Sequence, residues 1–130
     1  MAYSNGLKSE SFVASSDLSG AQYHIVDLTA AFKVDAAAAN KAFGVLQNKP
    51  QAGEHATVAI GGTTKVAAGA AVAVGDLITS AASGWAAVVA SGNAADKAVI
   101  GRAMTAAASG SVFSMLIDKF SIVRTGGLPI

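Results

Sequence analysis

The stretch VAAGAAVAVGDLIT, residues 66–79, decides the fold class of this 130-residue chain. Five of its fourteen residues are alanine, which is a good helix former and a poor strand former. Glycine nevertheless interrupts the region too often for a helix. Seven glycines fall within residues 61–101, namely Gly61, Gly62, Gly69, Gly75, Gly84, Gly92 and Gly101.

Short apolar runs alternate with turn signals along most of the chain. Gly61-Gly62, Gly75-Asp76 and Ser109-Gly110 are such signals, and a recurrence about every 8–12 residues is typical of β-sandwiches and β-barrels. The sequence therefore predicts an all-β fold, a small β-barrel with one short helical turn. The predicted strands are residues 21–28, 31–34, 43–47, 55–60, 64–67, 71–74, 77–79, 85–90, 98–105 and 112–117, and the helical turn lies within residues 35–44.

Alanine-rich strands suit a tightly curved barrel, because interior positions near the barrel axis are narrow. Glycine permits the bends that closure requires. Alanine on the outer face also lets another backbone approach closely. Only 13% of the residues are charged, so we expect part of the surface to be covered by another protein.

A faint internal repeat is present. Gly44, Gly53 and Ile60 recur 57 positions later, and each set frames a strand, a turn and a strand. Residues 112–117 alternate two largely apolar faces, which predicts a central or covered strand. The second copies are Gly101, Gly110 and Ile117, and the two faces are Val112, Ser114, Leu116 and Phe113, Met115, Ile117.

Composition argues against several classes of function. Nine basic and eight acidic residues are spread singly and leave a net charge of +1, so nucleic-acid binding is not expected. The chain has no cysteine, and no apolar run is long enough for a membrane helix. The first residues lack the pattern of a signal peptide. We therefore expect no nucleic acid, no membrane and no small-molecule substrate as partners.

No catalytic or cofactor motif is complete. His24 and His55 are the only histidines, and a metal site needs three or four convergent ligands. Residues 60–65 resemble a phosphate loop without its spacing, and no G-x-S-x-G element occurs. The sequence predicts a protein that is not an enzyme and has no cofactor or metal. The alternative is a small carrier or ligand-binding β-domain, because Asp96-Lys97-Ala98 resembles the tripeptide that presents a modified lysine.

The two ends of the chain differ from the middle. Residues 1–20 are polar and rich in serine, and two interpretations stay open: an arm that is mobile until it meets a partner, or a short edge strand at residues 11–15. We therefore divide the chain into an arm (1–20), a barrel (21–117) and a tail (118–130). The candidate contact residues are Tyr3, Leu7, Phe12 and Val13 in the arm, and Phe120, Ile122, Val123, Leu128 and Ile130 in the tail.

The order of several motifs resembles the capsid decoration (cement) proteins of tailed bacteriophages over about residues 21–117. The motifs are GVLQNKP (44–50), GE (53–54), ATV (56–58), KV (65–66), VGDLI (74–78) and VIGRA (99–103). The helix-like AAAANKAF (36–43) departs from that pattern.

The resemblance implies a compact barrel, called a β-tulip in related proteins, on the outer surface of the virion. Such proteins commonly form homotrimers that clamp neighbouring subunits of an HK97-fold major capsid protein in the expanded icosahedral head. In similar proteins an N-terminal arm becomes ordered on the capsid, often as an added strand. The resemblance therefore implies capsid contacts for the arm, and we expect the tail to pack on the capsid or on a neighbouring subunit.

Overall fold

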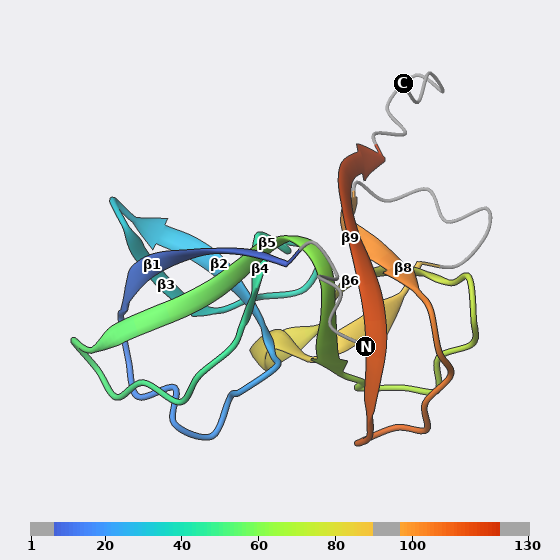
Figure 1. The fold of residues 1–130 in the computed structure, drawn as a ribbon, viewed down its shortest axis with the longest axis horizontal. Helices are drawn as coiled ribbons and strands as arrows, with labels where there is room; N and C mark the ends of the chain where they lie inside the picture. Colours follow the sequence, from blue (N-terminus) through green and yellow to red (C-terminus); the bar gives the residue numbers. More distant parts are fainter. Residues whose placement is uncertain (1–6, 90–96, 123–130) are drawn as a thin grey trace, which may run out of the picture.

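A computed structural model describes residues 7–89 and 97–122 and confirms the all-β fold (Figure 1). Within these residues the chain forms nine strands and one short 3-10 turn. Their bounds are β1 (Lys8–Ala14), β2 (Ile25–Ala30), β3 (Lys33–Ala36), β4 (Gly44–Leu46), β5 (His55–Ala67), β6 (Leu77–Ser80), η1 (Ala82–Gly84), β7 (Ala86–Val88), β8 (Lys97–Ala103) and β9 (Val112–Ile122).

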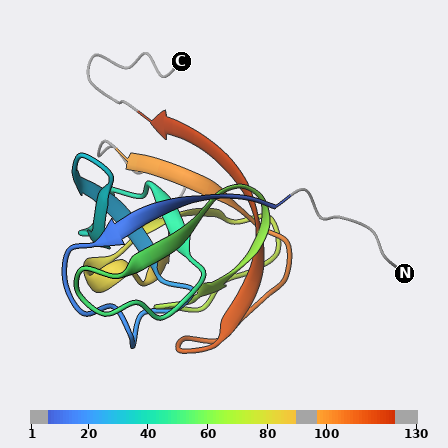
Figure 2. The same ribbon diagram turned by 60° about the vertical axis from the view of Figure 1, so that its left-hand side comes forward.

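The strands form two curled sheets that share β5 (Figures 1 and 2). The first contains β1, β3, β2, β4 and the first half of β5, and the β1–β5 pairing closes it into a five-stranded barrel. The second contains the other half of β5 followed by β9, β8, β6 and β7. A parallel bridge from Ala86 to Ala68 joins its two edges. We call these the first barrel (residues 8–61) and the second barrel (residues 62–122).

Strand β5 corrects one prediction. Residues 55–60 and 64–67 were expected to be two strands separated by a Gly61-Gly62 turn, but they form one strand of 13 residues. Gly61 pairs with Lys8 in the first barrel, and Gly62 pairs with Ile117 in the second. Gly62 has φ +85°, a backbone conformation that glycine adopts at little cost. The glycine pair therefore bends the strand from one barrel into the other.

The two barrels have the same pairing scheme. Val45 pairs with Ala59 in the first barrel, and Arg102 pairs with Leu116, each 57 positions later, in the second. Backbone hydrogen bonds outside the strands repeat as well, which confirms the internal repeat and extends it to a whole barrel. Examples are Ala14 N–Glu54 O (3.0 Å) with Ala68 N–Ser111 O (2.8 Å), Leu18 N–Pro50 O (2.9 Å) with Val72 N–Ala107 O (2.8 Å), and Leu46 N–His24 O (2.9 Å) with Ala103 N–Asp76 O (2.9 Å).

The repeated glycines have a steric reason. A Cβ atom on Gly44 would lie 2.8 Å from the Ala59 carbonyl oxygen, and one on Gly101 would lie under 3.0 Å from the Leu116 carbonyl oxygen. Real Cβ atoms essentially never approach so closely. Both positions therefore permit close contact between paired strands.

Small side chains fill much of the interior, as expected for narrow barrels. Strand β9 lies between β5 and β8 and is central, as predicted. Its Phe113 and Met115 are buried, whereas Val112 and Leu116 are exposed. The buried alanines are Ala14, Ala37, Ala56, Ala59, Ala67, Ala68, Ala86 and Ala103.

Two further predictions are wrong. The expected helical turn at residues 35–44 is absent, because Ala36 pairs with Val26 in β3 and Ala37 is fully buried in the core. Tertiary pairing outweighs the helix propensity of alanine there. Residues 71–74 are no strand either, since Val72 makes only a single bridge to Ala107.

Candidate functional site

The predicted arm residues fall into two groups. Phe12 and Val13 lie in β1, which is a strand of the first barrel. The Phe12 ring packs edge-on against Phe43, with centroids 5.5 Å apart, and the Val13 N–H donates to the Phe32 carbonyl oxygen. Leu7 precedes β1 and is 41% exposed, whereas Phe12 and Val13 are half-buried. Tyr3 lies outside the described residues.

The predicted tail residues are only partly described. Phe120 pairs with Val99 and Ile122 pairs with Lys97, so β9 continues past residue 117. Lys97, the lysine of the alternative carrier interpretation, is the first residue of β8. Val123, Leu128 and Ile130 lie outside the described residues.

A surface of mixed apolar and polar side chains lies on the outer side of β5 and β9 in the second barrel, where Arg102 pairs with Leu116. Leu116 and Met104 are 44% and 50% exposed, and the Thr63 hydroxyl lies 3.9 Å from the Met104 sulfur. Leu7 and Thr63 line a hollow of about 260 Å³ beside them. We call this surface the outer sheet face and define it by Leu7, Thr63, Lys65, Met104 and Leu116.

A second surface with exposed apolar side chains lies at the turn between β2 and β3, at the far end of the first barrel (Figure 1). Residues 28–32 form this hairpin tip, and all five are exposed. Leu28 is 44% exposed, and Phe32 is 72% exposed with φ +55°. The sequence analysis missed the tip, because AAFKV (30–34) has the composition of a strand.

The corresponding turn of the second barrel is buried at its two ends, whereas Ala82 and Ser83 between them are exposed. The register places Ser80 where the first barrel has Leu28, and Ala86 where it has Val34. Ser80 is 1% exposed, and its hydroxyl donates to the Ala38 carbonyl oxygen over 2.6 Å. The Phe32 position becomes Gly84, which is buried with φ +78°. This turn therefore serves as a contact between the two barrels.

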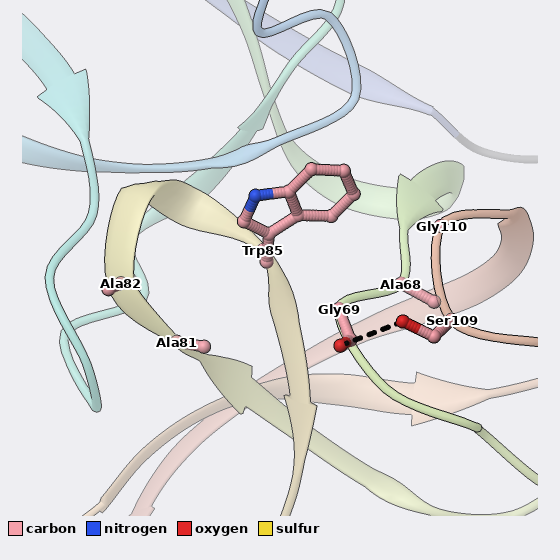
Figure 3. Close-up of a pocket in the computed structure, with 7 residues that line it drawn as sticks. All are labelled: Ala68, Gly69, Ala81, Ala82, Trp85, Ser109 and Gly110. Carbon is pink, nitrogen blue, oxygen red and sulfur yellow. Dashed lines mark hydrogen bonds between the residues drawn. The ribbon is translucent and has the colours of Figure 1, made fainter.

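Trp85 borders a pocket of about 260 Å³ on the second barrel (Figure 3). The two barrels differ at this place: the first barrel has a Ser15–Thr29 hydroxyl hydrogen bond of 2.9 Å, and the second has the small residues Gly69 and Ala81. The lining residues are Ala68, Gly69, Ala81, Ala82, Trp85, Ser109 and Gly110. They offer apolar surface and one hydroxyl, which already donates to the Gly69 carbonyl oxygen.

Both histidines have structural partners. His24 Nδ1 lies 3.0 Å from the Ser83 carbonyl oxygen, and its ring lies 4.5 Å from Trp85 between centroids. His55 Nδ1 lies 2.8 Å from the Ser11 hydroxyl. Within residues 7–89 and 97–122 no three His, Cys, Asp or Glu side chains gather as a possible metal site. No helix in the same residues could span a membrane.

Comparison with known proteins identifies the family. The family model for phage cement proteins matches residues 5–118. Among solved structures, the N base of the head fiber gp8.5 of bacteriophage phi29 is similar with a TM-score of 0.66 and 21% identity, covering 86% of this chain and 94% of that one. A search of the curated proteins found no match. The chain therefore belongs to the phage cement protein family and is a structural protein of the virion, at the surface of the capsid.

Proposed function

We propose that this protein stabilises the expanded icosahedral head by clamping neighbouring subunits of an HK97-fold major capsid protein. The observation that carries the proposal is the presence of two separate surfaces with exposed apolar side chains, one on each barrel. The hairpin tip presents Leu28 and Phe32, and the outer sheet face presents Leu7, Met104 and Leu116. Exposed apolar groups gathered in this way are characteristic of protein–protein contact sites.

The connection between the two surfaces supports bridging. Strand β5 runs without a break from one barrel into the other, and Ser80 bonds the second barrel to the loop after β3. A unit held in this way keeps its two contact surfaces at a fixed separation. If each surface binds a different capsid subunit, the second contact forms at high effective concentration, so modest single contacts add up to firm attachment.

The terminal contacts stay part of the proposal. Strand addition by residues 8–13 would compete with their pairing to β5, so we limit any added strand to the chain before Lys8. We propose Tyr3 and Leu7 as capsid contacts and a homotrimer as the assembled state. The tail residues proposed as capsid or subunit contacts are Phe120, Ile122, Val123, Leu128 and Ile130.

Co-sedimentation with expanded, undecorated heads of the parent virus tests the function. We expect saturable binding at a fixed number of copies per capsid subunit and a higher temperature of head rupture once the sites are filled. Unexpanded heads serve as the control, because a site formed by subunit movement exists only after expansion. Absence of binding to expanded heads, or binding that leaves rupture unchanged, contradicts the proposal.

A further inference from the structure

The hairpin tip carries large apolar side chains at positions that serve as a contact in the second barrel. Ser80 and Gly84 are buried against the first barrel. The matching residues Leu28 and Phe32 are 44% and 72% exposed. The two end positions of this turn are thus buried in one barrel and exposed in the other, and the exposed pair is the more apolar one.

The backbone of Phe32 is unusual for its residue type. Its φ of +55° lies in the left-handed region, where a bulky side chain is a rare outlier. The second barrel places glycine at this point of the same turn. Strained residues of this kind concentrate at binding sites, where the strain serves the function. An aromatic ring that is mostly in water gives little packing energy to its own chain, which leaves a contact with another molecule as its use.

The tip is also held in place. The Val13 N–H donates to the Phe32 carbonyl oxygen over 2.8 Å, and the Ser15 and Thr29 hydroxyls lie 2.9 Å apart. Both bonds join the turn to β1 and the residue that follows it. A ring presented on a fixed backbone loses little conformational entropy on binding, which favours its use as an anchor.

Membership of the phage cement protein family points to the capsid as the partner of the tip, and the contact between the barrels closes one site on a second copy. Gly84 packs against Ile25 and donates its N–H to the Ala37 carbonyl oxygen, so this contact site is already occupied within the chain. It also cannot accept a larger residue, because a Cβ on Gly84 would lie under 3.0 Å from the Ile25 carbonyl oxygen. The site that Gly84 occupies is therefore closed to Phe32 of a second copy.

We propose that Phe32 is an aromatic anchor that inserts into an apolar pocket on the outer surface of the capsid protein, with Leu28 packing at the rim of that pocket. This inference rests on the proposed function. The remaining tip residues Thr29, Ala30 and Ala31 are uncharged and exposed, so they carry no charge that would have to be desolvated at such a pocket.

Binding of full-length variants to expanded heads tests the anchor. Phe32→Gly keeps the left-handed backbone and removes the ring, and we expect Kd to rise about 10-fold to 100-fold, the range that burial of such a side chain supplies. Val74→Ser is the matched control, because Val74 is 68% exposed outside both the hairpin tip and the outer sheet face, and it should bind like the wild type. Equal binding by Phe32→Gly and wild type overturns the anchor while the proposed function stands. If the wild type itself does not bind, the proposed function fails, and the anchor fails with it.

Sedimentation velocity of the free protein, without heads, tests whether the hairpin tip binds a second copy of the chain. We expect Phe32→Gly to leave the assembly state of the free protein unchanged. A smaller assembly for Phe32→Gly would overturn the inference and make the tip a contact between copies, with the Trp85 pocket as the site to examine next. Phe32→Asn provides a second variant, because asparagine tolerates the left-handed region and should lose binding to a similar degree.

Discussion

Replacement of Gly101 by alanine should be among the most damaging single-methyl changes in this protein. The new Cβ would lie under 3.0 Å from the Leu116 carbonyl oxygen, a backbone atom that cannot rotate away. To reach ordinary van der Waals contact, β8 and β9 must separate locally by roughly 1 Å. That separation weakens about two ladder hydrogen bonds, each worth about 0.5–1.5 kcal/mol. The strain of an overpacked site adds about 1–3 kcal/mol.

The two terms sum to about 2–6 kcal/mol, with a midpoint of about 4 kcal/mol, a large part of the roughly 5–15 kcal/mol that stabilises a typical domain. The midpoint of thermal unfolding should fall by about 10–20 °C. Urea unfolding followed by the fluorescence of Trp85, the only tryptophan, measures the change. Gly20→Ala is the control, because a Cβ atom on Gly20 would have no atom within 4 Å apart from its chain neighbours. Its effect on the free energy of unfolding should stay within about 0.5 kcal/mol. Equal stability of Gly101→Ala and Gly20→Ala would refute the close-approach argument.

Three more predictions concern stability. Phe32→Gly should raise the free energy of unfolding by about 0.5 kcal/mol, since relief of the left-handed strain exceeds the entropy cost of glycine; destabilisation in urea would contradict this. Ser80→Ala should lower the free energy of unfolding by about 1–3 kcal/mol, because the Lys41 N–H loses the Ser80 hydroxyl to which it donates over 3.0 Å. Thermal unfolding measures the loss, with Ser83→Ala as the control at an exposed serine. Hydrogen bonds from Ser19 lower the pKa of Asp17, so its stabilising contribution is present at neutral pH and lost as pH falls through the folded-state value. Asp17→Asn should therefore weaken the pH dependence of stability in the acidic range. Equal loss of stability on acidification in Asp17→Asn and in the wild type would contradict this prediction.

Much of the architecture could be predicted because glycines occur where the backbone has a positive φ or where two strands approach closely, so their spacing indicates the backbone geometry. Gly44 and Gly101 mark the same close approach in two barrels, and Gly53 and Gly110 mark the same turn, with φ of +84° and +86°. Three matched positions were enough to indicate the repeat. The full duplication was hidden, because most of the other equivalent residues, such as Leu46 and Ala103, share hydrogen bonds and differ in side chain.

The errors arose where tertiary contacts override local preference. The alanines after Asp35 favour a helix in isolation, but Ala36 pairs with β2 and Ala37 is buried in the core. Gly61-Gly62 is a plausible turn in isolation, and only the presence of a strand on each side keeps β5 continuous. The hairpin tip was missed for a related reason, because the left-handed backbone of Phe32 leaves no trace in the sequence around it.

The shared strand also determines how the protein would carry mechanical load. A pull between the hairpin tip and the outer sheet face reaches β5 through β1 and β4, the strands that pair with β3 and β2. Strand β5 then carries the load into the second barrel, because it belongs to both barrels. Its neighbours β1 and β9 run antiparallel to it, so tension along β5 loads their hydrogen bonds in shear, and many bonds resist together. A shell that swells under internal pressure would then stretch a strand along its length and would not peel two domains apart.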